Sequence, residues 1–186
     1  SPINSRLCAG NFTNEFYFGS LSYDYFSLDN QNPIPDLDQS IFACNKDWDL
    51  ISEFRPSNIL STKNKFFSQK KIGDRLIIPF RDPAPMNNNK LAVCTGGFRW
   101  GLEGNVCEVT YTDKKFKITR ETILENDMRI FREIERCTFW NEFMFFSVTG
   151  NSNKIKVAKL NKSGLYSFYG EIKNSDGLFG PCVDNK

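Results

Sequence analysis

Residues 141–172 carry the pattern that most constrains the fold. An apolar run over 143–148 is followed by the turn cluster Thr-Gly-Asn-Ser-Asn, an alternating segment around Ile155 and Val157, the turn Asn-Lys-Ser-Gly, and an aromatic run over 165–169. Short β-branched and aromatic runs separated by Gly, Asn and Ser turns are typical of antiparallel strands. We therefore predict three consecutive strands, a β-meander, in this part of the chain.

Similar signals elsewhere predict a mostly β protein built from antiparallel meanders. We expect a hairpin around Gly19-Ser20, a second hairpin around the Gly-Asp step at 73–74, and further strands over 91–95 and 106–112. One segment differs, because its apolar residues fall at helical spacing and predict one helix near 119–136. The residues that form its apolar face are Leu124, Met128, Phe131 and Ile134, with Thr119 or Thr122 as the cap.

A segment near the N-terminus is nearly repeated towards the C-terminus. "CAGNFTNEFYFGSL" at 8–21 and "CTFWNEFMFFSVTG" at 137–150 both run from a cysteine through Asn-Glu-Phe into aromatic residues and a serine. Phe16 and Phe143 are separated by three steps of about 42 residues, and some β-propellers repeat at about 40–45 residues. The arrangement is therefore either a small β-propeller, or a β-sandwich or partly closed barrel. The predicted helix favours the sandwich or barrel, because a propeller blade would need strands in its place.

Length and charge limit the classes of protein. The 186 residues suit one domain over 1–186, and the formal charge of +2 lacks the basic excess of nucleic-acid binders. No apolar run approaches the roughly 18 residues of a membrane-spanning helix, so we expect no transmembrane segment in this chain. Because the chain opens on Ser-Pro-Ile-Asn-Ser without a signal peptide, we interpret it as a processed form or an excised ectodomain.

Six dispersed cysteines and two sequons indicate an extracellular, secreted, or cell- or virion-surface glycoprotein. No cysteine lies in a Cys-x-x-Cys pair and the chain has no histidine, so disulfides are expected and a metal site is not. The sequons are at Asn11 and Asn161. The expected disulfides are a local one between Cys94 and Cys107, one joining the ends between Cys8 and Cys182, and one between Cys44 and Cys137 by elimination.

The lack of histidine also removes the usual nucleophile-activating base. Paired carboxylates remain, at Asp36 with Asp38 and at Asp47 with Asp49, and they leave a carboxylate-dependent glycan hydrolase as an alternative. A secreted β-barrel carrier of a small ligand is the other alternative. The prediction is a module that is not an enzyme, needs no cofactor, and binds a protein or glycan receptor at a cell surface.

The segment "CTGGFRWGLEGNVC" at 94–107 is the predicted binding site. Its four glycines allow tight turns, and Phe98, Arg99 and Trp100 include residue types that dominate binding hot spots. If Trp100 belonged to the core instead, the segment would be a structural hairpin.

Three segments, "CAGNFTNEFYFG", "KKIGDRLIIPF" and "CTFWNEFMFFSV", resemble blade strands in the globular heads of paramyxovirus attachment glycoproteins. That resemblance implies a β-propeller head that binds a host receptor. Those heads have six longer blades and are about twice this length. The arginine cluster of the sialidase members of that family has no counterpart that we can place in this chain, so the resemblance implies no catalytic residue.

Overall fold

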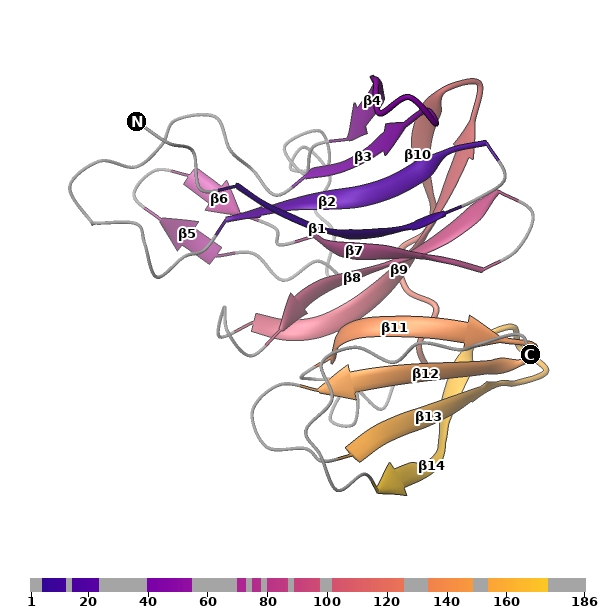
Figure 1. The fold of residues 1–186 in the computed structure, drawn as a ribbon. Coiled ribbons are helices and arrows are strands. Elements are labelled where there is room, and N and C mark those ends of the chain that lie inside the picture. Colours follow the sequence, from indigo (N-terminus) through magenta and orange to yellow (C-terminus); the bar gives the residue numbers. More distant parts are fainter. Residues whose placement is uncertain are drawn as a thin grey trace.

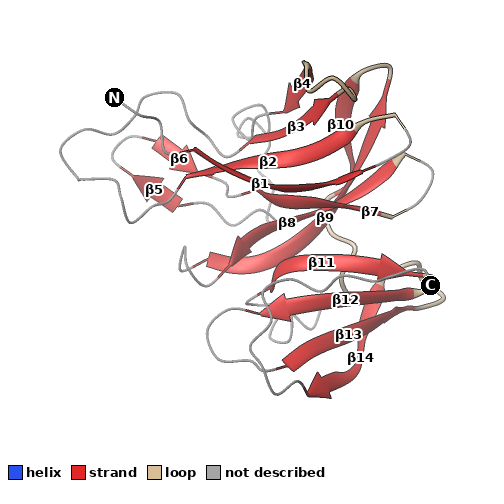
Figure 2. Ribbon diagram, viewed as in Figure 1, coloured by secondary structure: helices blue, strands red, loops and turns tan. Residues whose placement is uncertain are grey.

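The structure is a computed structural model, shown as a ribbon in Figure 1. Within its described part the regular elements are all β-strands, without a helix (Figure 2), which confirms the prediction of a mostly β, antiparallel chain. In that part of the chain no helix is long and apolar enough to span a membrane. The structure describes residues 5–12, 15–23, 40–54, 70–72, 75–77, 80–86, 89–97, 102–125, 134–148 and 154–173.

The first four strands form an antiparallel sheet, the N-terminal sheet, in which each strand pairs with the next along the chain. Gly19 lies in the interior of β2, opposite Phe42 of β3, so the predicted hairpin turn at Gly19-Ser20 is wrong. The strand continues there because the Phe42 ring covers the glycine. The strands are β1 (Ser5–Phe12), β2 (Tyr17–Tyr23), β3 (Ser40–Cys44) and β4 (Leu50–Phe54).

A second antiparallel sheet, the central sheet, again pairs consecutive strands. The strands predicted over 91–95 and 106–112 are confirmed as parts of β8 and β9. Asp113 and Lys114 join β9 to β10 with φ angles of 50° and 60°, as a two-residue type I′ hairpin requires. The strands are β7 (Phe80–Pro85), β8 (Lys90–Gly97), β9 (Leu102–Thr112) and β10 (Lys115–Arg120), preceded by a separate pair at the predicted Gly-Asp turn, β5 (Lys70–Ile72) and β6 (Arg75–Ile77).

The third antiparallel sheet, the C-terminal sheet, contains the meander predicted over 141–172. The predicted apolar run coincides with β12, and the two later strands lie where the alternation places them. A first strand, which the sequence pattern did not reveal, pairs with β12 on the other side. The strands are β11 (Ile134–Trp140), β12 (Phe143–Val148), β13 (Lys154–Leu160) and β14 (Tyr166–Lys173).

The near-repeat in the sequence corresponds to equivalent places in two sheets. Asn141 and Glu142 form the turn between β11 and β12, and the matching segment around Glu15 lies between β1 and β2. In each case the cysteine lies on the first strand of a four-stranded sheet and the phenylalanine precedes or begins the second. Both segments therefore span the first two strands of a four-stranded sheet, although the last pairs before the turns differ, Phe12 with Tyr17 and Trp140 with Phe143.

The main apolar core lies between the central and C-terminal sheets. It contains Cys94 and Val106 from the central sheet and Met144, Phe146 and Ala158 from the C-terminal sheet, all fully buried. Strand β11 packs against β7 and β8, so it forms the seam between the two sheets. Burying a phenylalanine or methionine side chain stabilises a fold by about 1.5–3 kcal/mol, so this seam holds the two sheets together.

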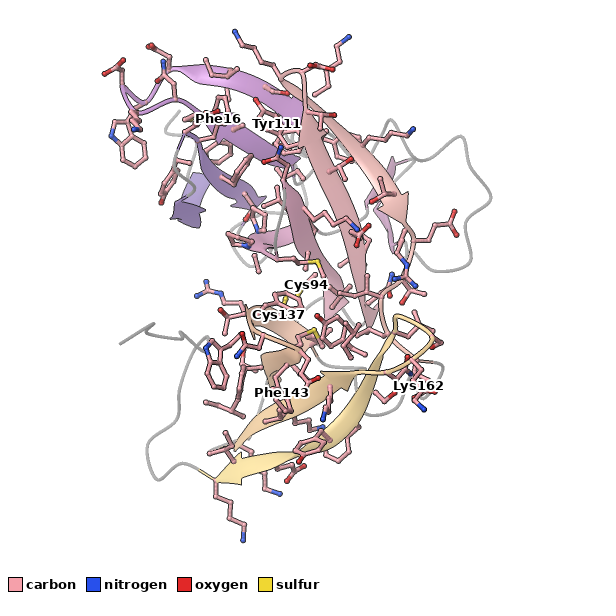
Figure 3. The ribbon with its side chains drawn as sticks, turned by 90° about the vertical axis from the view of Figure 1, so that its right-hand side faces the viewer. Phe16, Cys94, Tyr111, Cys137, Phe143 and Lys162 are labelled. Carbon is pink, nitrogen blue, oxygen red and sulfur yellow. The ribbon has the colours of Figure 1, made fainter. Side chains whose placement is uncertain are left out.

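A second, aromatic cluster joins the N-terminal and central sheets. Phe18 of β2 packs edge-on against Tyr111 of β9, with 5.1 Å between ring centroids, and Phe16 and Phe116 complete the cluster. Figure 3 shows Phe16 and Tyr111 together at one end of the molecule. These three phenylalanines therefore serve packing between the two sheets.

The helix predicted near 119–136 is wrong at both ends. Residues 115–120 belong to β10 and residues 134–140 to β11, while 126–133 lie outside the described residues. Leu124 and Ile134 are both buried in the main core, but Leu124 reaches it from an extended segment that bridges Tyr166 in parallel. Their helical spacing arises because two separate segments contribute to one core.

Candidate functional site

The two faces of the C-terminal sheet are both apolar, but only one of them is covered by another sheet among the described residues. Side chains alternate between the two faces along β12 and β13. Met144, Phe146 and Ala158 therefore point towards the main core, and Phe143 and Phe145 point to the opposite face. A half-buried strand normally carries polar residues on its solvent side. Aromatic residues on this outer face therefore need an explanation beyond packing, and they form the candidate site.

The hairpin between β11 and β12 places the first two aromatic side chains. Asn141 takes a φ of 52°, a left-handed conformation that asparagine tolerates better than most residues. The resulting two-residue turn sets Trp140 directly opposite Phe143 in the ladder, on one face of the sheet. Glu142 accepts a hydrogen bond at its carbonyl from the backbone N–H of Leu160, 2.8 Å away, which ties this turn to the end of β13.

A β-bulge in β14 places the third aromatic side chain. The pairing register of β14 shifts where Ala158 and Val157 of β13 pair with Phe168 and Gly170, so Tyr169 is the extra residue between them. Bulges turn a side chain away from the direction that alternation would give it. The Tyr169 ring thereby reaches Phe143, with 5.4 Å between centroids in an edge-to-face arrangement.

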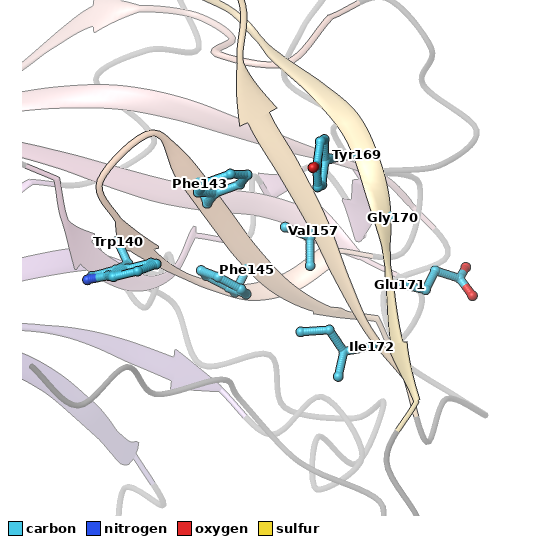
Figure 4. A pocket seen from close by; sticks show the side chains of 8 residues that line it. All are labelled: Trp140, Phe143, Phe145, Val157, Tyr169, Gly170, Glu171 and Ile172. Carbon is cyan, nitrogen blue, oxygen red and sulfur yellow. The ribbon is translucent and has the colours of Figure 1, made fainter. Parts of the chain in front are cut away.

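These side chains line an open pocket on the outer face of the sheet (Figure 4), which we call the aromatic pocket. Its volume is about 310 Å³, and it is mostly apolar. Trp140, Tyr169 and Ile172 on its rim remain 48%, 64% and 48% exposed, which is far from the usual burial of such residues. The full lining is Trp140, Phe143, Phe145, Val157, Tyr169, Gly170, Glu171 and Ile172.

One lysine lies beside the aromatic pocket. The Lys159 Nζ lies 5.4 Å from the Phe143 ring centre and 5.8 Å from that of Tyr169, within the range of cation–π attraction, and 3.0 Å from a Glu142 oxygen. Lys154 binds Glu171 at 2.8 Å, and this hydrogen bond lowers the pKa of the Glu171 carboxyl. Lys159 pairs with Phe143 and shares its face of the sheet, whereas Lys154, Lys156 and Lys173 alternate to the opposite face together with Glu171.

A smaller polar pocket of about 190 Å³ lies beside the seam between the central and C-terminal sheets. Its buried carboxylate, Glu108, accepts hydrogen bonds from Lys90 at 3.2 Å and from the Thr119 hydroxyl at 2.8 Å. Arg120 donates to the Gly164 carbonyl at 2.6 Å. These groups already have partners within the protein, and Glu108 is the one carboxylate among the described lining residues, so this pocket lacks the carboxylate pair of a glycan hydrolase.

The loop predicted as the binding site is only partly described. Strands β8 and β9 form the expected hairpin, with Gly97 opposite Leu102. Phe98, Arg99 and Trp100 lie outside the described residues, so their role stays a prediction.

The predicted disulfide between Cys94 and Cys107 is wrong. Cys94 faces Val106, and Val93 faces Cys107, so the two cysteine side chains point to opposite faces of the central sheet. Cys94 belongs to the core against the C-terminal sheet, whereas Cys107 belongs to a separate core cluster with Ile41 of the N-terminal sheet. Strand alternation decides this outcome, because residues 13 apart along a hairpin do not have to share a face.

The predicted pairing of Cys44 with Cys137 is also wrong. Cys44 lies in the N-terminal sheet, and the sulfur of Cys137 contacts that of Cys94. The structure holds Cys44, Cys94, Cys107 and Cys137 as free, buried thiols. The pairing of Cys8 with Cys182 is untested, since Cys182 and the side chain of Cys8 are outside the described residues.

Two further groups of predicted residues have structural partners. The Asn161 side-chain oxygen accepts hydrogen bonds from the backbone N–H groups of Ser163 and Leu165, both at 3.0 Å, so it organises the turn between β13 and β14.

Asp47 and Asp49 lie in the exposed turn between β3 and β4, where the Asn45 side-chain oxygen accepts hydrogen bonds from both of their backbone N–H groups. Asn11 is in β1 with its side chain undescribed, and Asp36 and Asp38 lie outside the described residues. Modification of either asparagine stays a prediction.

Comparisons of the chain with models of protein families, with curated proteins and with solved structures found no match. Among the described residues, no group of three or more cysteine, aspartate or glutamate side chains is arranged to hold a metal ion.

Proposed function

We propose that this protein is a non-enzymatic recognition module of a secreted, cell-surface or virion-surface glycoprotein, and that it binds a protein receptor through the aromatic pocket. The observation that carries the proposal is the exposure of Trp140, Tyr169 and Ile172 around one pocket. Partly exposed aromatic residues clustered around a pocket are typical of binding hot spots.

The chemistry of the pocket favours an apolar side chain of a protein over a sugar. A glycan needs several hydrogen-bonding groups for its hydroxyls, whereas among the side chains of the lining only Trp140, Tyr169 and Glu171 carry such groups. Lys159 beside the pocket favours an acidic residue next to that apolar anchor. The partner segment that fits is therefore an apolar residue flanked by Asp or Glu.

The two alternative functions have less support. A glycan hydrolase needs two carboxylates about 5–10 Å apart at a cleft, and Asp47 and Asp49 are exposed residues of a structured turn. A carrier of small ligands needs an enclosed apolar cavity, whereas Trp140 and Tyr169 on the rim of the aromatic pocket are 48% and 64% exposed.

We also propose that the three four-stranded meanders are blades of a β-propeller type. Each has strands in sequence order, and β7 contacts the first strands of both other sheets, β1 and β11. Such contacts are expected where inner strands gather around an axis. This arrangement and the reuse of the Asn-Glu-Phe unit support the resemblance to paramyxovirus attachment heads.

The test is binding of the purified, labelled protein to a panel of cultured cell lines, comparing three variants. We expect Trp140→Ala and Tyr169→Ala each to weaken binding by about 30-fold, the factor equivalent to a 2 kcal/mol hot spot. Trp48→Ala is the matched control, because Trp48 is 60% exposed in the turn between β3 and β4, and binding by this variant is expected to stay unchanged.

Two treatments of the cells separate a protein receptor from a glycan. Trypsin is expected to abolish binding, and removal of cell-surface glycans is expected to leave it intact. Added salt should slow association, because the lysine-rich strands attract the acidic partner at long range. Equal binding by wild type and Trp140→Ala, with both proteins folded, would exclude the aromatic pocket as the site.

A further inference from the structure

Two buried cysteines from different sheets face each other at the seam. Cys94 of β8 and Cys137 of β11 are 0% and 8% exposed, and their Sγ atoms are 3.6 Å apart. Figure 3 shows both sulfurs between the central and C-terminal sheets. The side chains are 43 residues apart in the sequence, so only the packing of the two sheets brings them together.

The other described cysteines are not alternatives for either partner. Cys107 points to the opposite face of the central sheet, where its thiol donates to the Val93 carbonyl at 3.5 Å. Cys44 lies on β3 of the N-terminal sheet, which does not share the seam. Among the described thiols, Cys94 and Cys137 are therefore the pair positioned for a bond.

We propose that Cys94 and Cys137 form a disulfide that crosslinks the central and C-terminal sheets. A disulfide needs its sulfur atoms about 2.05 Å apart, so small side-chain rotations from the thiol contact are sufficient. The sequence alone predicts other partners for both of these cysteines. It does not depend on the proposed receptor.

The bond forms by thiol–disulfide exchange with a disulfide oxidant, such as glutathione disulfide or an oxidised dithiol oxidoreductase. One cysteine thiolate attacks the oxidant and forms a mixed disulfide, with one oxidant thiolate as the leaving group. The second cysteine then displaces the remaining oxidant thiolate. In total the two cysteines lose two protons and two electrons, and the oxidant disulfide is reduced to two thiols.

The burial of the pair determines when oxidation can occur. The thiol contact with Cys94, together with burial, raises the pKa of Cys137, so the folded dithiol contains little thiolate. The core around the pair also excludes a bulky oxidant. Bond formation is therefore expected during folding, before the two sheets close on each other, in a compartment that supplies the oxidant.

The crosslink closes a loop of about 43 residues, which includes β9, β10 and the start of β11. In the chain-entropy model a loop of this size gives a stabilisation that corresponds to a Tm increase of about 10 °C for a chain of this length. The bond also fixes β11, and with it the hairpin that carries Trp140 on the opposite face of the same sheet.

The first test is peptide mapping of unreduced protein folded in a glutathione redox buffer, with free thiols blocked before digestion. We expect one peptide that joins Cys94 to Cys137 and that disappears after reduction. Free thiols at both positions, or a bond from Cys94 to Cys107 or from Cys44 to Cys137, would overturn the proposal. This measurement uses wild-type protein, so it does not depend on whether variants fold.

The second test compares Tm with and without dithiothreitol. Wild type is expected to lose about 10 °C on reduction, whereas Cys94→Ala with Cys137→Ala should show no shift from this bond. Cys107→Ala is the matched control, since Cys107 is equally buried in the central sheet, and it should keep the full shift. If the wild-type Tm does not change when the Cys94–Cys137 bond is completely reduced, the bond does not stabilise the fold.

Discussion

Gly19 and Phe42 give a direct test of how the N-terminal sheet is packed. The two residues are opposite each other in the β2–β3 ladder, and Phe42 is only 4% exposed. A Cβ atom added at Gly19 would lie 2.5 Å from Phe42 Cζ and 2.9 Å from Cε1. Ordinary carbon contacts are at about 3.5–4.0 Å, so the ring has to move by about 1 Å in a filled core.

We expect Gly19→Ala to lower the free energy of unfolding by about 1–2 kcal/mol. Overpacking a core by one methyl group costs about 1–3 kcal/mol, and the smaller entropy of the unfolded alanine chain returns about 0.4–1 kcal/mol. The measurement is urea unfolding at equilibrium, where a shift of the midpoint at constant m-value reports stability.

Gly170→Ala is the matched control, because Gly170 is also a strand glycine and a Cβ there would meet nothing within 4 Å. Its free energy of unfolding should change by less than about 0.5 kcal/mol. In the Phe42→Leu background, the cost of Gly19→Ala should fall by about 1 kcal/mol, because the clashing ring atoms are gone. Equal effects of the two glycine substitutions, or no coupling to Phe42, would refute the described packing.

Two further predictions concern a turn and a buried thiol. Asn161→Ala is expected to destabilise the protein by about 2 kcal/mol, because three hydrogen bonds to the side-chain oxygen are lost. Asn161→Asp keeps an acceptor oxygen and should lose clearly less stability. Urea unfolding of the unglycosylated proteins measures both losses. Burial raises the pKa of Cys107, so the folded state holds this proton more tightly than the unfolded state. The contribution of Cys107 to the free energy of unfolding is therefore constant below about pH 8.5 and falls above it by up to about 1.4 kcal/mol per pH unit. Cys107→Ala should flatten that alkaline decline in unfolding experiments from pH 8 to 10, and an unchanged slope would contradict the assignment.

Local pattern was sufficient for several strands, but it missed others, such as β3, β4 and β11, and it placed a turn inside β2. The run at 143–148 and the alternation around Val157 predict β12 and β13, because period-2 side-chain direction is a property of each strand by itself. The hairpin β8–β9 follows from the same rule. The same local reasoning failed at 119–136, where Leu124 and Ile134 come from separate extended segments that meet in one core. A spacing of apolar residues cannot tell whether one element or two supply it.

The cysteine partners and the candidate site were decided by the tertiary structure. Alternation shows that Phe143 and Met144 lie on opposite faces of β12, yet it cannot say which face another sheet will cover. The packing of β11 on the central sheet covers Met144, leaves Phe143 beside Trp140 and Tyr169, and sets Cys137 against Cys94. The sequence determined strands such as β12 and the alternation of their side chains, because these depend on neighbours along the chain. Contacts between residues 43 positions apart depend on how whole sheets stack, and only the folded chain specifies that.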